Sequence, residues 1–456
     1  MKTLAYCLVA CLALPALGQT VDPFSEAYAR YLMGTLAADS LEGRDPLRPS
    51  IEKATRFLEA EMKAIGLDFL PGTHSYRHPV TLWRLMPPSP ERIVLTVTAP
   101  GAAPQTLSAL AVVASPQKDP FVLGGRVGAG QDVVYRQVDQ EAVLHIMQGN
   151  DTTSAALQLI GVSDTSLLQG ILDYLQWEQF VTELPETAAK QRLYVVLDSL
   201  PQVLAPGTEV RLTYTPAYKA IQAYNVIGQL TGSSQPETQV ILGGHYDHVG
   251  VGRPNAEGDS IYNGANDDAS GTAAVLMLAR HYAALPTRPA RTVVFGCWTG
   301  EELGLLGSSY FAKQVQPESV AAMLNLEMMG QPWKYGPGSV YITGYAHSNL
   351  GALLQAHAPA DSTFRLYPDP YTAMQLFFRS DNLGFARLGI PAHTLCTADM
   401  DRPGSVFYHM PDDEIENMDL KAFAQMVQGI GAALWPLLDG QLTPNRLPQA
   451  VVDQLR

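Results

Sequence analysis

The chain has 456 residues, of which 46% are hydrophobic and 16% charged, and its formal net charge is −14 at pH 7. This apolar content is enough for a sizeable core, which excludes a chain that is disordered throughout. The negative charge argues against nucleic acid or an anionic membrane surface as a partner, because both attract basic patches. It suits a protein that binds divalent metals or the amino terminus of a peptide.

The first 18 residues have the pattern of a secretory signal peptide. A short basic start, Met1-Lys2, precedes an apolar run that ends with Ala16-Leu17-Gly18. Leu8-Val9-Ala10-Cys11 also fits a bacterial lipoprotein box, but few apolar residues precede Cys11, so a cleaved leader is favoured. No other stretch reaches the roughly 18 apolar residues of a membrane span. We therefore expect an exported protein, periplasmic or secreted, without a stable membrane span.

Removal of residues 1–18 would leave Cys297 and Cys396 as the remaining cysteines. Both lie in apolar, strand-like runs, which favours buried free thiols. An exported location would also permit a disulfide, and the sequence does not decide whether they pair.

Residues 19–91 are predicted to be the amino-terminal part of a catalytic domain. The segment 25–66 is typical of helices, with Ser50 as a candidate N-cap and Gly66 as a candidate stop. Apolar residues between them recur on one helical face, so we expect this helix to pack on a sheet.

Residues 92–215 change to short β-rich runs separated by Gly, Pro, Gln and Ser. Because they contain no cluster of His, Cys and acidic residues, we interpret them as a smaller inserted domain without catalytic residues.

From residue 216 to residue 442, strand-like runs alternate with helical runs. Strands are predicted at 240–242, 292–295 and 323–326, and helices at 271–285, 308–314 and 420–438. This alternation indicates an α/β fold, with a mainly parallel central sheet flanked by helices. Ligands of such sheets collect at the carboxyl ends of strands. The tail, residues 443–456, is expected to be peripheral.

Potential metal ligands follow the first of these strands. His245 and Asp247 are two residues apart, so in extended geometry they face the same side, and one can bind a metal while the other orients a ligand. His248 should face the opposite way and is left out of the predicted site.

Acidic residues stand at two further strand or helix ends. Asp267 and Asp268 open the helix at 271–285, where they could cap it or supply one ligand. Glu301 and Glu302 follow the strand at 292–295, and neighbouring carboxylates can divide into a metal ligand and a general base.

Glu327 and His409 are weak signals alone, but they complete a set. The set has two histidines and three carboxylates, which suits two zinc ions bridged by one carboxylate: His245, Asp267, Glu302, Glu327 and His409. Metal-assisted hydrolysis is therefore the leading hypothesis.

These motifs resemble the zinc-dependent aminopeptidases of the M28 type, which are co-catalytic two-zinc exopeptidases. The resemblance rests on Gly244 to His248, Asn263 to Gly271, Thr299 to Ser308, Asn325 to Met328, Arg379 to Asp381 with Gly389 to Pro391, and Tyr408-His409. Leu41 to Arg44 also resembles the start of such enzymes. Residues 92–215 faintly resemble their protease-associated insertion.

The resemblance implies a zinc-exopeptidase fold and a role for each residue. Asp267 would bridge two Zn²⁺ ions, one completed by His245 and Glu327, the other by Glu302 and His409. Glu301 would be the general base and Asp247 would orient His245. The chain departs from the family at Glu327, where most members carry Asp, and at Asn382, which replaces a common His.

The favoured function is removal of the amino-terminal residue from peptides with a free amino terminus. Two alternatives remain: a glutaminyl-cyclase-like acyltransferase on the same fold, typically with one zinc, and a non-catalytic binding ectodomain. The sequence does not decide the preferred residue, dipeptidase against aminopeptidase activity, or oligomeric state.

Overall fold

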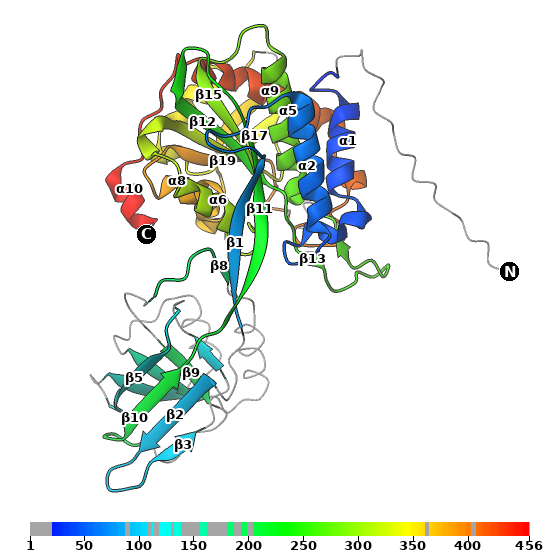
Figure 1. Ribbon diagram of the computed structural model, residues 1–456. Helices are drawn as coiled ribbons and strands as arrows, with labels where there is room; N and C mark the ends of the chain where they lie inside the picture. Colours follow the sequence, from blue (N-terminus) through cyan, green and yellow to red (C-terminus); the bar gives the residue numbers. More distant parts are fainter. Residues whose placement is uncertain are drawn as a thin grey trace, which may run out of the picture.

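The structure is a computed structural model that describes residues 21–86, 92–107, 111–113, 118–128, 132–137, 156–161, 180–186, 193–197, 204–360, 364–402 and 407–455. The predicted leader, residues 1–18, lies outside the described residues. Figure 1 shows a larger α/β part and a smaller β-rich part, joined through the long strands β1 (Arg77–Leu85) and β11 (Tyr218–Leu230). Within the described ranges, no helix combines the length and apolarity needed to cross a membrane.

A nine-stranded sheet forms the centre of the larger part, as far as the structure is described, in the order β18-β17-β19-β16-β12-β15-β11-β1-β8. Its other strands are β8 (Phe180–Val181), β12 (Gln235–His245), β15 (Arg291–Trp298), β16 (Val320–Glu327), β17 (Ser339–Ile342), β18 (Arg365–Pro368) and β19 (Ala392–Cys396). Strands β15, β12, β16 and β19 run parallel, whereas β11, β1 and β8 pair antiparallel and β17 is antiparallel to β19. The predicted parallel pairing therefore holds in the centre of a mixed sheet.

Both faces of this sheet are buried, which explains why its central strands are almost continuously apolar. Along β12, Val240 and Leu242 point into one hydrophobic core and Ile241 into the other. Residues alternate between the faces of a strand, so each face needs its own helical cover.

Helices cover the sheet on both sides (Figure 1). The first core holds α1 (Glu26–Leu36), α2 (Ile51–Ile65), α5 (Gly271–Ala284), α7 (Leu350–Ala356) and α9 (Leu420–Leu438); the second holds α6 (Leu306–Ala312), α8 (Asn382–Ala386) and α10 (Gln449–Gln454). Short helices are η1 (Asp39–Arg44), η3 (Ala265–Ser270), η4 (Pro317–Ser319), η5 (Tyr345–His347), η6 (Thr372–Met374), η7 (Leu376–Phe378) and η9 (Ile415–Asn417). The predicted alternation of strands and helices is confirmed.

Two sequence signals at helix ends had different outcomes. Gly66 ends α2 in the left-handed conformation, with φ of 83°, as predicted. Ser50 is wrong as an N-cap, because its own backbone is helical and its side chain makes no capping hydrogen bond. As predicted for one face of this helix, Ala54, Leu58 and Met62 bury their side chains in the first core.

The carboxyl-terminal tail is part of the fold, so the prediction of a peripheral tail is wrong. Leu447, Val452 and Leu455 are buried in the second core. These three residues are too far apart in the sequence to form a recognisable helix or strand pattern. They are buried because they pack on one face of the central sheet. Cys297 and Cys396 are buried and unpaired, as favoured from the sequence.

The β-rich part contains two four-stranded sheets in its described segments. One joins β2 (Ile93–Thr98), β3 (Gln105–Leu107), β5 (Phe121–Arg126) and β10 (Glu209–Tyr214); the other joins β4 (Ala111–Val113), β6 (Val133–Gln137), β7 (Leu157–Gly161) and β9 (Leu193–Leu197). Leu95, Leu159 and Leu212 share a core that is separate from the two cores of the central sheet. The interpretation of this part as a protease-associated-like insertion stays a prediction.

Candidate metal centre

The predicted site residues come together at the carboxyl edge of the parallel strands. His245 is the last residue of β12 and Glu327 the last of β16. Glu301 and Glu302 follow β15, whose last residue, Trp298, pairs with His245. Because β15 and β16 flank β12, three successive strand ends deliver these side chains to one place.

The turn before α5 supplies Asp267. The carboxylate of Asp413 accepts hydrogen bonds from the backbone N–H groups of Asn266 and Asp267, at 2.8 and 3.0 Å. The neighbouring Asp268 turns the other way, and its Oδ1 accepts from the backbone N–H groups of Gly271 and Met328, both at 3.0 Å. The two aspartates therefore separate into one that faces the histidines and one that joins α5 to the end of β16.

His245, Asp267 and Glu327 form the first group of potential metal ligands, with all their ligand atoms within 4.8 Å of one another. His245 Nε2 is 3.2 Å from Asp267 Oδ1 and 3.2 Å from Glu327 Oε1. Its Nδ1 is 3.0 Å from the backbone carbonyl of Asp247. A ring whose Nδ1–H is bonded in this way presents the lone pair of Nε2 to a metal. Ser380 donates to the other oxygen of Glu327 at 2.5 Å.

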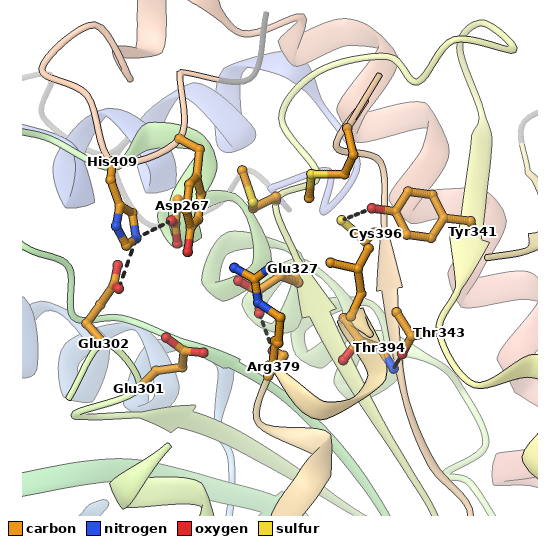
Figure 2. A pocket seen from close by; sticks show the side chains of 15 residues that line it. Asp267, Glu301, Glu302, Glu327, Tyr341, Thr343, Arg379, Thr394, Cys396 and His409 are labelled. Atoms are coloured by element: carbon orange, nitrogen blue, oxygen red, sulfur yellow. Dashed lines mark hydrogen bonds and ion pairs between the residues drawn. The ribbon is translucent and has the colours of Figure 1, made fainter. Parts of the chain in front are cut away.

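The second group contains His248, Asp267, Glu302 and His409. The two oxygens of Glu302 are divided between the histidines: Oε1 is 2.7 Å from His248 Nδ1 and Oε2 is 3.0 Å from His409 Nε2. His409 Nε2 is also 3.4 Å from Asp267 Oδ2. Figure 2 shows His409 directed at both carboxylates. Asp267 thus belongs to both groups.

The structure corrects the prediction that His248 faces away from the site. Strand β12 ends at His245, so the two-residue alternation does not extend to His248. The backbone N–H of His248 instead donates to the carbonyl of Arg44. With its backbone held there, the side chain of His248 points toward Glu302. A sequence signal did exist, since a second histidine, His248, follows three residues after His245.

We expect His248→Ala to weaken the binding of one zinc ion by about 10–100-fold, because Glu302 would lose the group that orients its Oε1. The ion held by the first group should bind as before. Zinc titration of the metal-free protein measures both affinities. His281→Ala, in the last turn of α5 and outside both ligand groups, is the matched control. Equal weakening of both ions by His248→Ala would contradict this division.

Asp247 contacts the site at two points. Its backbone carbonyl bonds to His245, whereas its carboxylate Oδ1 accepts from the backbone N–H of Glu301 at 3.2 Å and lies 3.9 Å from His245 Nδ1. Burial raises the pKa of this carboxyl to about 7. The side chain therefore fixes the Glu301 turn more closely than it contacts the histidine.

Glu301 and Glu302 have opposite electrostatic surroundings. Burial raises the pKa of Glu301 well above its ordinary value, and Glu327 and Glu302 raise it further against the effect of His245. Burial also raises the pKa of Glu302, but His248 and His409 outweigh it and lower the value to about 2. Neighbouring carboxyls with separated pKa values are typical of sites that divide acid–base roles. Glu302 suits an ionised ligand and Glu301 a proton carrier.

A cavity lined by residues of both groups opens beside them. Figure 2 shows Glu301 and Glu302 on one side of the view and Glu327 nearer its centre. Its less polar lining consists of Met328, Tyr341, Leu376, Cys396, Met400 and Tyr408. The cavity can therefore hold a small substrate with its polar end toward the carboxylates and an apolar side chain toward this lining.

The donor set fits zinc. Imidazole nitrogens and carboxylate oxygens are common zinc ligands, and each group leaves room for a further ligand. The facing polar atoms of the second group approach one another closely: His409 Nε2 is 3.0 Å from Glu302 Oε2 and 3.4 Å from Asp267 Oδ2. A metal ion held between these three side chains would satisfy all of them.

Comparison with known proteins gives consistent matches. Residues 225–434 match the family model described as Peptidase family M28. A probable zinc metalloprotease of Pyrenophora teres f. teres is 34% identical over 170 residues, which are 37% of this chain and 34% of the relative. A probable leucine aminopeptidase 2 of Aspergillus fumigatus is 30% identical over 230 residues, 44% of this chain and 41% of the relative. The chain thus spans well under half of these curated relatives.

Solved structures share the fold. An aminopeptidase from Aneurinibacillus sp. strain AM-1 has a TM-score of 0.51 and 17% identity, covering 93% of this chain and 96% of that one. A zinc aminopeptidase from Bacillus subtilis has a TM-score of 0.51 and 18% identity, covering 92% and 97%. At this identity the likeness is one of fold.

Proposed function

On the match of residues 225–434 to the model of peptidase family M28, we propose that the chain is a zinc-dependent aminopeptidase that hydrolyses the amino-terminal residue from peptides. One observation carries the proposal: two groups of metal ligands share Asp267, and Glu301 lines the same cavity without belonging to either group. This arrangement suits hydrolysis assisted by two metal ions.

In the proposal, His245 and Glu327 hold one zinc ion and Glu302 and His409 hold the other, with Asp267 between them. Zinc in these positions would polarise the scissile carbonyl and make water a nucleophile near neutral pH. Ser380 orients Glu327 through its hydrogen bond, and the longer Glu side chain reaches to within 3.2 Å of His245. The departure from the more usual Asp is therefore compatible with the first group.

Glu301 is the proposed general base. Its Oε2 is 3.9 Å from His245 Nε2, so it stands beside the first group and faces the cavity (Figure 2). It would take a proton from the attacking water and donate it to the leaving amine. The hydrogen bond from its backbone N–H to Asp247 keeps the turn in place while the side chain works.

The substrate end of the cavity is suited to a free amino terminus. In the proposal Asp267, Glu302 and Glu327 hold zinc, so Glu301 is the lining carboxylate whose charge is left to attract a substrate ammonium, and the oxygens of the ligand carboxylates can accept hydrogen bonds from it. Blocked amino termini would lose that attraction, which favours exopeptidase action. The side chain of the first residue would lie against the apolar lining at Met328, Tyr341 and Leu376.

We further propose that the protein is exported, on the signal-peptide pattern of residues 1–18. The glutaminyl-cyclase alternative typically uses a single zinc, whereas two ligand groups are available here. The binding alternative leaves Glu301 without a role, although its pKa is strongly raised. Both are therefore less well supported than hydrolysis.

The test is mass spectrometry of a mixed peptide set with free, acetylated and Gln-initial amino termini, incubated with the mature protein. We expect stepwise loss of single residues from the unblocked peptides alone, and no loss after zinc chelation. Restoring zinc should restore the reaction. Loss of ammonia alone from Gln-initial peptides would favour the cyclase, and no change in any peptide with zinc fully loaded would favour a binding role.

A further inference from the structure

The proposed mechanism leaves the motif Leu41 to Arg44 without a role, yet its last residue is placed unusually. Arg44 ends η1 and its side chain is completely buried, with 0% of its surface exposed. Burying a guanidinium is costly unless its N–H groups are bonded. The bonds that satisfy it show what the residue does.

All five N–H groups of the Arg44 guanidinium donate to backbone carbonyls. Nε donates to Tyr246 at 2.6 Å; Nη1 to Leu36 at 2.7 Å and Asn263 at 2.5 Å; Nη2 to Gly264 at 2.8 Å and Asp267 at 3.4 Å. Arginine has five such donors in a rigid planar fork, so its capacity is used completely.

Four of the five carbonyls belong to two loops at the metal centre, one directly after the proposed ligand His245 and one that carries the proposed ligand Asp267. Tyr246 lies between His245 and His248, and the carbonyl of Arg44 also accepts from His248 at 3.3 Å. The other loop, residues 263–267, carries the shared ligand Asp267. Asp413 bonds the N–H groups of this loop while Arg44 bonds its carbonyls, so the loop is held from both sides.

The backbone before Arg44 is specialised for this close approach. Gly43 has φ of +67°, and a Cβ there would lie 2.4 Å from the carbonyl oxygen of Gly250 and 2.6 Å from that of Tyr262. Arg44 itself has φ of 52°, in the left-handed region. Such conformations persist where the surroundings enforce them.

We propose that Arg44 is a positioning residue that sets the spacing of the two metal-binding groups, by joining the 246–248 loop and the 263–267 loop at one guanidinium. The inference rests on the proposed function in one respect: it takes from that function that the metal is zinc. Its charge is also complementary to the site: burial lowers the pKa of Arg44, and Asp413, Asp267, Asp247 and Asp268 act against that decrease.

Arg291 provides a matched control, because it lies at the start of β15, the end of this strand that is away from the metal centre. Arg291 is also buried, at 4% exposure, and its guanidinium donates to the backbone carbonyls of Leu437 and Leu442 and to the hydroxyl of Thr443. It opens β15, whereas the metal ligands follow the end of that strand. Its replacement should therefore affect folding without affecting the ligand loops.

The experiment compares Arg44→Met with Arg291→Met in the full-length mature protein. Zinc affinity is measured by chelator competition, and melting temperature is measured for the metal-free and zinc-loaded forms. We expect Arg44→Met to weaken zinc binding by at least about tenfold and to reduce the zinc-induced rise in melting temperature. Arg291→Met should lower both melting temperatures and leave zinc affinity unchanged.

Arg44→Lys is the second variant, to be used if Arg44→Met does not fold. Lysine keeps the positive charge but has too few N–H groups to bond five carbonyls. This variant should fold and show weakened zinc binding. Zinc affinity within about twofold of the wild type in the folded Arg44 variants, with melting temperatures lowered as for Arg291→Met, would overturn the proposal. These readouts need no peptide turnover, so a wild-type protein that binds zinc but hydrolyses nothing would refute the proposed function alone.

Discussion

Glu301→Gln is expected to reduce kcat by about 10²–10⁴-fold while the protein keeps its zinc. Glutamine is nearly isosteric with glutamate but cannot accept the proton of the attacking water. Glu301 belongs to neither ligand group, and its backbone N–H still reaches Asp247 in the variant. Steady-state kinetics on an unblocked peptide and metal analysis of the same sample measure the two quantities together.

The adjacent residue supplies the control. Glu302→Gln removes a ligand of the second group, so it should reduce zinc content as well as turnover. The pair separates proton transfer from metal binding at two neighbouring positions. Wild-type turnover in Glu301→Gln would refute the general-base role, and loss of zinc from Glu301→Gln would make this residue a ligand.

The second large effect is expected from Asp267→Asn, which should weaken the binding of both zinc ions by more than about 100-fold. Replacing a group that merely orients a ligand typically costs 10–100-fold, and Asp267 is itself shared by both groups. An amide lacks the charge that offsets two divalent ions. Zinc content after dialysis, with calorimetric titration, measures the loss.

Glu327→Gln is the comparison, because Glu327 belongs to the first group alone. It should weaken one ion and spare the other. Asp413, which holds the backbone of Asp267, is intact in both variants, so a change in the loop is not the cause. Loss of a single ion from Asp267→Asn would contradict the shared position.

Much of the central sheet could be predicted because its pattern is local. The strands at 240–242, 292–295 and 323–326 lie within β12, β15 and β16, and the helix at 420–438 coincides with α9. Apolar runs of these lengths have few other stable arrangements than a sheet buried on both faces. Ligands of parallel sheets collect at the carboxyl ends, so the strand ends also indicated where site residues would lie.

The sequence alone was therefore enough to predict three central strands, where they end, and the acidic and histidine residues that follow them. It did not predict three contacts that depend on the folded chain: His248 with Glu302, the tail with a core, and Arg44 with Gly264, 220 positions away. Beyond a strand end no periodicity fixes the direction of a side chain, and the partners of a buried polar group are chosen by proximity in space. Such contacts exist only once the chain has folded.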